Sequence, residues 1–249
     1  MEKIMLFPKS EINKDFSQTS KLIYGFPKTG KSTLCSHFKS IDGRPPLFIA
    51  TEDGHGALEV FFQRITDWND FEKLLVTIKN HKTTIQNEHS CFVVDILSDL
   101  DLWLTRKICY DNRAQHLFDD KIFPYGKGSS IHKNLFQAAM SVLFGILPVN
   151  FIAHSKEKEV MWEGEKIKVQ APSLSTGVME YINGKVDMIG WISPSRAGKD
   201  MPRIIFKGSD TCLAGSRYKS LVREFNYNPA NPGEVYLEMQ TTFEEGMNT

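Results

Sequence analysis

Short runs of apolar residues recur along the first two thirds of the chain. They cover residues 21–24, 47–50, 91–94 and 149–153. Runs of this length without polar alternation predict strands that are buried on both faces of a sheet, as parallel strands are. Glycine or polar residues follow each run at once. The carboxyl ends of the predicted strands therefore carry the side chains that are suited to chemistry.

Helical spacing separates these predicted strands. Residues 71–78 place apolar side chains at positions i, i+3, i+4 and i+7, which predicts an amphipathic crossover helix. Residues 32–38 and 135–147 are also predicted to be helical. Because strands alternate with helices, we expect an α/β fold in which helices cover both faces of a mostly parallel sheet. Ligands bind such sheets at the carboxyl edge of the strands.

The rest of the chain has a different pattern. Residues 155–176 are polar and rich in lysine, and Glu163-Gly164-Glu165 predicts the turn of a hairpin. Residues 186–225 hold short strand-like runs between Gly, Pro and Ser, which predicts antiparallel strands toward the C-terminus. The expected organisation is an N-terminal extension over residues 1–20, one core domain over 21–225 and a C-terminal tail over 226–249.

Composition narrows the classes of function. Lys+Arg and Asp+Glu both number 30, so the formal net charge is zero and a site for a polyanion must be a local patch. The four cysteines have neither zinc-site spacing nor a C-x-x-C pair, which indicates buried thiols in a reducing compartment. Charged residues and Pro8 interrupt the first positions, so we expect no signal peptide and a cytoplasmic protein.

One motif predicts a nucleotide site. Residues 25–32 read G-F-P-K-T-G-K-S and match G-x-x-x-x-G-K-[ST], the loop whose backbone amides surround phosphate oxygens. Lys31 is expected to reach the β- and γ-phosphates of ATP, and Ser32 to bind Mg²⁺. The predicted nucleotide-binding residues are Gly25, Phe26, Pro27, Lys28, Thr29, Gly30, Lys31, Ser32 and Thr33. The alternative is a glycine turn with an exposed lysine, but a predicted strand precedes the loop and a predicted helix follows it.

Asp95 ends an apolar strand, where a carboxylate can hold the shell of the magnesium ion. A helix-capping aspartate is the alternative interpretation. Ile96 and Leu97 follow, so there is no adjacent glutamate to activate water. We therefore expect the general base to come from another strand.

Glu52 is the expected general base, because it follows the strand after the loop's helix. A capping pair with Asp53, or a carboxylate that holds a hydroxyl substrate as in small-molecule kinases, stays open. His154 closes the next predicted strand and is expected to sense the γ-phosphate, although a lone histidine is more often structural. All of these residues fall at strand ends, so they are predicted to share one edge of the sheet.

Two clusters of basic residues offer further candidates. Arg217 and Lys219 alternate along a strand-like segment and could reach the ATP of a neighbouring subunit as trans-acting fingers, with a solvated basic edge as the alternative. The stretches 125–128 and 156–168 hold lysines beside Tyr125 and Trp162 and could grip single-stranded DNA. Glutamates between these lysines dilute their charge, so a plain solvated hairpin is an equal interpretation of the second stretch.

A series of short motifs carries a resemblance. The series is Tyr24-Gly25 to Gly30-Lys-Ser-Thr33, Phe48-Ile-Ala-Thr-Glu52-Asp-Gly54, Val93-Val94-Asp95, Phe151-Ile-Ala-His154 and Ala214-Gly-Ser-Arg217. Over residues 20–225 the chain resembles phage-encoded P-loop ATPases, core-only relatives of the RecA recombinases, some of which look like single-strand annealing proteins. The resemblance implies a RecA-like fold, a catalytic role for Glu52, a magnesium role for Asp95 and a sensor role for His154. Ile96 departs from it, because the family usually has a hydroxyl residue there.

The expected function is ATP binding and hydrolysis, with ATP and Mg²⁺, in phage DNA recombination or replication in the host cytosol. A homo-oligomer is expected to bind ATP between subunits, which orders residues 124–133 and 155–175 onto single-stranded DNA and promotes annealing. A single-strand binding protein is a further candidate partner. Two alternatives stay open: a P-loop kinase, with Arg106 or Arg113 as a lid cation, and a nucleotide-dependent scaffold or loader for a replication partner.

Overall fold

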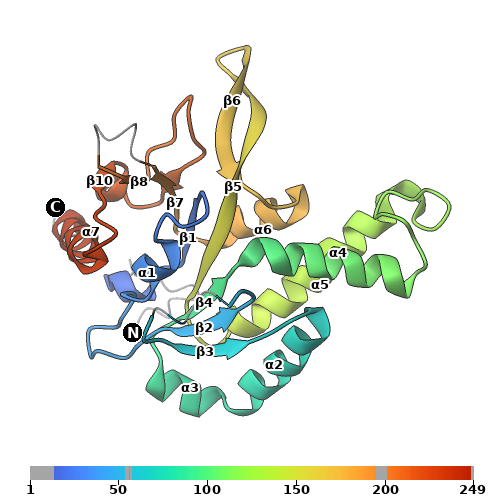
Figure 1. The fold of residues 1–249 in the computed structure, drawn as a ribbon, viewed down its shortest axis with the longest axis horizontal. Helices are drawn as coiled ribbons and strands as arrows, with labels where there is room; N and C mark the ends of the chain where they lie inside the picture. Colours follow the sequence, from blue (N-terminus) through green and yellow to red (C-terminus); the bar gives the residue numbers. More distant parts are fainter. Residues whose placement is uncertain (1–13, 54–55, 57, 195–200, 248–249) are drawn as a thin grey trace, which may run out of the picture.

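The computed structural model describes residues 14–53, 56, 58–194 and 201–247 (Figure 1). The strands in this part of the chain are β1 (Lys21–Gly25), β2 (Leu47–Ala50), β3 (Phe61–Arg64), β4 (Phe92–Asp95), β5 (Val149–Trp162), β6 (Glu165–Pro172), β7 (Met188–Ser193), β8 (Arg203–Ile205), β9 (Gly215–Ser216) and β10 (Glu224–Asn226). The α-helices are α1 (Lys31–Cys35), α2 (Trp68–Asn80), α3 (Lys82–Glu88), α4 (Leu97–Asp111), α5 (Lys127–Phe144), α6 (Thr176–Lys185) and α7 (Pro232–Met247). Short 3-10 turns, η1 (Phe16–Gln18), η3 (Pro124–Gly126) and η4 (Lys219–Leu221), complete the described elements.

The described strands form one mixed sheet in the order β10-β8-β7-β1-β5-β4-β2-β3, with β6 paired to β5 and β9 paired to β7. The strands from β7 to β3 in this order pair in parallel. The pairs that involve β8, β9 and β10 are antiparallel. The predicted fold class, a mostly parallel α/β sheet with antiparallel C-terminal strands, is confirmed.

Two apolar cores cover the two faces of the sheet. One buries side chains of α2, α4, α5 and α6 against the sheet, and the other buries side chains of α1 and α7. Successive residues of a strand point to opposite faces, so a strand buried on both sides is apolar at nearly every position. This is why Leu22 and Ile23, neighbours in β1, lie in different cores. The predicted strands at 21–24, 47–50, 91–94 and 149–153 are all present.

Strand β5 continues well beyond the sheet. It spans 14 residues, and its distal half pairs antiparallel with β6, from Ser155 opposite Pro172 to Trp162 opposite Glu165. Glu163 and Gly164 turn between them with positive φ angles of 48° and 90°. The predicted hairpin is confirmed, and Figure 1 shows it standing out from the body of the protein.

Other elements differ from the predictions. The helix predicted at 135–147 begins at Lys127, and the helix predicted at 32–38 ends at Cys35. Strand β3 and helices α4 and α6 were not predicted, because polar residues interrupt their apolar spacing. The prediction that Arg217 and Lys219 lie on one strand is wrong, since β9 ends at Ser216 and Lys219 begins a 3-10 turn.

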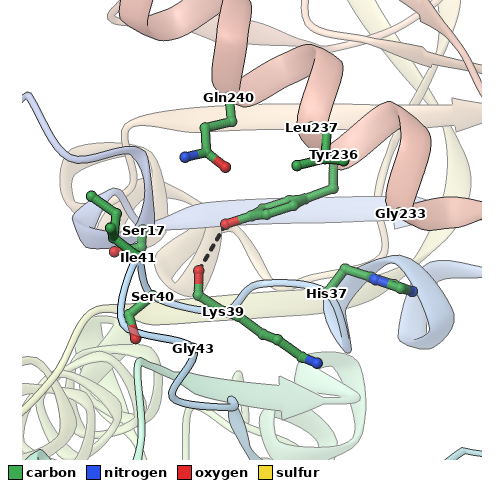
Figure 2. A pocket seen from close by; sticks show the side chains of 10 residues that line it. All are labelled: Ser17, His37, Lys39, Ser40, Ile41, Gly43, Gly233, Tyr236, Leu237 and Gln240. Carbon is green, nitrogen blue, oxygen red and sulfur yellow. Dashed lines mark hydrogen bonds between the residues drawn. The ribbon is translucent and has the colours of Figure 1, made fainter.

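Part of the predicted C-terminal tail is the packed helix α7. Its Tyr236 side chain lies between Phe16 and Phe38, with ring centroids 5.7 and 5.6 Å away. The Tyr236 hydroxyl donates a hydrogen bond of 2.9 Å to the carbonyl oxygen of Lys39 (Figure 2). The groove of about 380 Å³ around this contact separates α7 from the segment that follows α1. Helix α7 is therefore anchored to the element that begins at the phosphate-binding motif.

Candidate nucleotide-binding site

The loop with the G-x-x-x-x-G-K-S motif joins the carboxyl end of β1 to the first turn of α1. Gly30 caps α1 with a φ of 83°, a left-handed conformation that favours glycine. At Gly25, an added Cβ atom would lie 3.0 Å from the carbonyl oxygen of Ile192 on the neighbouring strand β7. Local sterics thus explain why glycine occupies both positions. The predicted strand, loop and helix are confirmed.

Lys31 is buried at the start of α1. Its Nζ donates hydrogen bonds to the carbonyl oxygens of Gly25, at 3.2 Å, and Phe26, at 2.7 Å. Burial lowers the pKa of Lys31 below its ordinary value, while the negative charges of Asp95 and Glu52 act in the opposite direction. The ammonium group is therefore folded into the loop and lies within electrostatic reach of both acidic candidates. A phosphate group would be a stronger acceptor than these carbonyls.

Ser32 and Asp95 meet directly. The Ser32 hydroxyl donates a hydrogen bond of 2.6 Å to a carboxylate oxygen of Asp95. Ser32 lies in α1, the helix that follows β1, and Asp95 is the last residue of β4, which β5 separates from β1 in the sheet. Magnesium keeps several waters and binds one or two protein oxygens together with substrate phosphates, so a hydroxyl beside a carboxylate fits that ion.

Thr51 joins the ends of β2 and β4. Its hydroxyl donates to a carboxylate oxygen of Asp99 at 2.7 Å and accepts from the backbone N–H of Ile96 at 2.9 Å. The backbone N–H of Thr51 also donates to the carbonyl of Asp95, at 2.7 Å. These bonds fix the position of Glu52, the next residue, relative to Asp95.

Glu52 and His154 face each other at the same edge of the sheet. Nε2 of His154 lies 3.6 Å from a carboxylate oxygen of Glu52, and the Glu52 side chain is 52% exposed. His154 pairs in register with Gly25, the first glycine of the loop, so it borders the phosphate-binding loop directly. Its buried Nδ1 has no hydrogen-bond partner among the described residues. Asp53, by contrast, forms an ion pair with Arg64 at the end of β3.

Tyr227 is a component of the site that sequence reasoning missed. Its hydroxyl donates a hydrogen bond of 2.7 Å to the carbonyl oxygen of Gly30, and its side chain is fully buried. Burial raises the pKa of Tyr227, so the hydroxyl keeps its proton as a donor at neutral pH. Tyr227 lies 197 residues from Gly30. A contact between residues so far apart in the chain leaves no local signal in one sequence. Thr51, which sequence reasoning also missed, at least lies next to Glu52, a residue that it identified.

Arg217 lies away from this edge. Its guanidinium donates to the carbonyl of Gly184 at 2.9 Å and lies 3.3 Å from Asp187. Asp187 precedes β7, whose first residue pairs with Lys21, so Arg217 sits at the amino edge of the parallel strands. The loop of its own subunit lies at the carboxyl edge. This placement leaves the trans-acting role of Arg217 and Lys219 a prediction.

The described ranges hold no cluster of three or more His, Cys, Asp or Glu side chains arranged for a metal ion. The four cysteines are free thiols. Among the same residues, no helix combines the length and the apolar character needed to cross a membrane.

Comparison with known families agrees with this geometry. The profile of a family described as an AAA domain matches residues 17–218, most of the chain. No curated protein matches the chain. The match begins just before β1 and includes the phosphate-binding loop, Glu52, Asp95 and His154. The chain therefore belongs to the AAA domain family of P-loop ATPases.

Proposed function

We propose that this protein binds ATP with Mg²⁺ and hydrolyses it at the carboxyl edge of the sheet. The observation that carries the proposal is the 2.6 Å contact between Ser32 and Asp95, next to Lys31, whose charge interacts with those of Asp95 and Glu52. Such a set contains each part that phosphoryl transfer to water requires: a backbone cradle, a cation, a magnesium site and a candidate base. When bound, the magnesium ion would neutralise charge on the β- and γ-phosphates.

Each residue has a separate task in this proposal. The loop amides and Lys31 bind and orient the phosphates, which requires Lys31 to leave the carbonyls of Gly25 and Phe26. Glu52 accepts a proton from the attacking water, and its exposure lets water reach it. His154 holds the Glu52 carboxylate in place and can donate to a phosphate oxygen when ATP enters.

The test compares phosphate release by the wild-type chain with that of Lys31→Ala. Hydrolysis that needs magnesium and disappears with Lys31, but continues in Lys79→Ala, a variant of an exposed lysine of α2 outside the loop, supports the proposal. Retained micromolar ATP affinity in Lys31→Ala would reject it. The kinase alternative is separated by product analysis: ATP with nucleosides would then yield a phosphorylated nucleoside, whereas ATP alone would yield little free phosphate.

We further propose that single-stranded DNA is the partner and that the chain acts in DNA recombination or replication, promoting annealing. The supporting observation is that β5 carries His154 at the site and continues into the projecting β5–β6 hairpin (Figure 1). Two of the hairpin lysines already have partners: Lys156 donates to the carbonyl of Leu174, and Lys168 pairs with Glu157 at 2.9 Å. DNA binding through this hairpin would therefore rest on few free charges.

Salt dependence tests the DNA proposal. Each phosphate contact with a single strand displaces counterions, so log affinity is expected to fall with log salt at a slope of roughly −0.7 per contact. A flat response, or no binding to any oligonucleotide in the presence of ATP, would favour the kinase or scaffold alternatives. ATPase rates with and without DNA, measured together with light scattering, would also show whether assembly accompanies hydrolysis.

The proposal includes a homo-oligomer in which Arg217 and Lys219 act on the ATP of a neighbour. Arg217→Ala is then expected to bind ATP and hydrolyse it poorly. Mixing it with Glu52→Gln chains restores an intact pair at some interfaces, so part of the activity should return. Two inactive variants that co-assemble and stay inactive at every ratio would contradict a trans role.

A further inference from the structure

Helix α1 carries the end of the phosphate-binding motif, and it is short. It spans Lys31–Cys35, after which the chain tightens into turns, with the N–H of His37 bonded to the carbonyl of Leu34 at 3.1 Å. A helix of so few residues is not stable in water by itself, because isolated helices need about 12–15 residues. Helix α1 therefore depends on contacts with other elements, and those contacts also shape the site for the phosphates.

The C-terminal part of the chain supplies such contacts. One apolar core holds side chains from α1, from the turn after it and from α7, among them Leu34, Cys35 and Phe38 on one side and Val235, Tyr236 and Met239 on the other. The family profile ends at residue 218, so α7 and the strand before it, β10, lie outside the matched region. The support for α1 thus comes from a part of this chain that the family match does not include.

Two tyrosines of this C-terminal part bond to the backbone at the two ends of α1. The Tyr227 hydroxyl donates a hydrogen bond of 2.7 Å to the carbonyl oxygen of Gly30, the residue directly before the helix. The Tyr236 hydroxyl donates one of 2.9 Å to the carbonyl oxygen of Lys39, in the segment after the helix (Figure 2). The two bonds therefore fasten both ends of α1 to the C-terminal part of the chain.

We propose that Tyr227 is a positioning residue for the phosphate-binding loop, an inference that rests on the proposed function. Tyr227 acts through the peptide group that joins Gly30 to Lys31. A trans peptide group is planar, and its carbonyl and its N–H point in opposite directions. A bond that fixes the direction of the Gly30 carbonyl therefore also fixes the direction of the Lys31 N–H. That N–H lies at the N-terminus of α1, where the amides of the motif face phosphate oxygens.

Tyr227 is itself held in place by the sheet. Its side chain is fully buried, and its backbone N–H donates a hydrogen bond of 2.7 Å to the carbonyl oxygen of Pro202. It directly follows Asn226, the last residue of β10, which pairs with Arg203 of β8. The hydroxyl can therefore hold the loop in one shape before a nucleotide arrives. Amides that are ordered in advance bind a ligand without a further ordering cost.

Removing the Tyr227 hydroxyl should change the loop without unfolding the protein. The Gly30 carbonyl also accepts the N–H of Leu34 at 2.9 Å, so Tyr227→Phe leaves this acceptor with a partner. Tyr236→Phe is the matched control, because it removes the same kind of bond, from a buried tyrosine to a backbone carbonyl. That carbonyl belongs to Lys39, which lies outside the motif. Both variants should therefore lose a similar amount of stability, and only Tyr227→Phe should affect the binding of phosphates.

The experiment measures the affinity of the wild-type chain and of both variants for ATP and for inorganic tripolyphosphate, each with magnesium. Tyr227→Phe is expected to weaken both ligands about three- to tenfold, the range for the net loss of one hydrogen bond. The KM for ATP should rise in parallel while kcat stays near the wild-type value, because Glu52 and Asp95 are unchanged. Tyr236→Phe should leave both affinities and the KM at their wild-type values.

Thermal unfolding of the same three proteins separates positioning from stability. Similar falls in melting temperature in both variants, with a loss of affinity only in Tyr227→Phe, support the inference. Equal losses of affinity in the two variants, or an unchanged affinity in Tyr227→Phe, would overturn it and leave the proposed function intact. A loss of affinity for ATP alone would overturn it too, because the loop contacts phosphates. A wild-type chain that binds neither ligand would reject the proposed function itself, and the inference with it.

Discussion

The hydroxyl of Tyr227 donates a hydrogen bond to the carbonyl oxygen of Gly30, and the same oxygen accepts the N–H of Leu34 in the first turn of α1. One backbone carbonyl thus joins the phosphate-binding loop, its helix and the segment that leads to α7. A Cβ atom added at Gly30 would lie 2.3 Å from the Tyr227 oxygen. Tyr227, which lies outside the phosphate-binding motif in the sequence, therefore holds the loop in place.

We predict that Gly30→Ala abolishes ATP binding and lowers the melting temperature. The substitution adds both a strained positive φ and the contact with Tyr227. Gly43→Ala is the matched control, because Gly43 has a φ of 84° with nothing within 4 Å of an added Cβ. Calorimetric titration with ATP and thermal unfolding would compare the two. Equal losses in both variants would show that the φ angle alone matters.

Glu52→Gln should bind ATP normally and turn it over about 10²–10⁴-fold more slowly, because the amide cannot accept the proton of water. Asp53→Asn is the control, since Asp53 is a neighbouring carboxylate that pairs with Arg64. Single-turnover phosphate release measures the effect. Wild-type turnover in Glu52→Gln would assign the base to another residue, and lost binding would indicate a structural carboxylate.

Thr51→Val should destabilise the fold by about 1–3 kcal/mol, because the buried N–H of Ile96 loses its acceptor and Asp99 loses a donor. Turnover should also fall, since Glu52 follows Thr51 directly. Thr51→Ser keeps the hydroxyl and should recover both properties. Urea unfolding and initial rates provide the two readouts, and a valine variant with wild-type turnover would show that Glu52 is positioned by other contacts.

We predict that the free energy of unfolding rises with pH because Lys21 is buried. Burial lowers its pKa from 10.5 to about 8, while its Nζ donates to the carbonyls of Phe16 and Thr19. Below pH 8 both states are charged, and the folded state carries the full cost of burying the charge. Between pH 8 and 10.5 the unfolded chain binds more protons, so the free energy of unfolding should increase, by about 3 kcal/mol in total.

Lys21→Met is the control for that prediction, because it keeps a long apolar stem without a titrating group. The difference in unfolding free energy between wild type and variant should change between pH 8 and 10 and stay constant from pH 6 to 7.5. Buried tyrosines with raised pKa values, Tyr24 and Tyr236 among them, titrate in both proteins and cancel in the difference. A difference that is independent of pH would show that Lys21 keeps its ordinary pKa.

Sequence reasoning located the parts of the site that are contiguous or lie at strand ends. The loop follows a fixed pattern, and Glu52, Asp95 and His154 each end an apolar run whose parallel pairing brings it to one edge. The contact between Tyr227 and Gly30 depends on tertiary packing across almost the whole chain, so no local period reveals it. Arg217 and Lys219 show the opposite error. Their alternating positions suggested that both lie on one strand, but β9 ends at Ser216.

The elements that were missed have a physical explanation too. Helix α4 buries Leu97, Leu100, Leu104 and Ile108, but charged residues between them hide the spacing, and Asp101 is itself buried. That carboxylate accepts hydrogen bonds from the backbone and hydroxyl of Ser175 and lies 3.1 Å from His132. From the sequence alone, a buried polar residue such as Asp101 is assigned to the surface, because the partners that allow its burial are unknown.

Strand β5 connects His154, beside the phosphate-binding loop, to the tip of the hairpin without a break. From His154 to the last strand residue, Trp162, the distance is about 26 Å at the usual strand rise, and every residue of this arm from Ser155 on has a partner in β6. A pivot of about 10° at His154 would carry the tip through about 4–5 Å on that strand rise. Under the proposed function, a loss of phosphate beside Gly25 that turned β5 at His154 would therefore displace the tip of the hairpin.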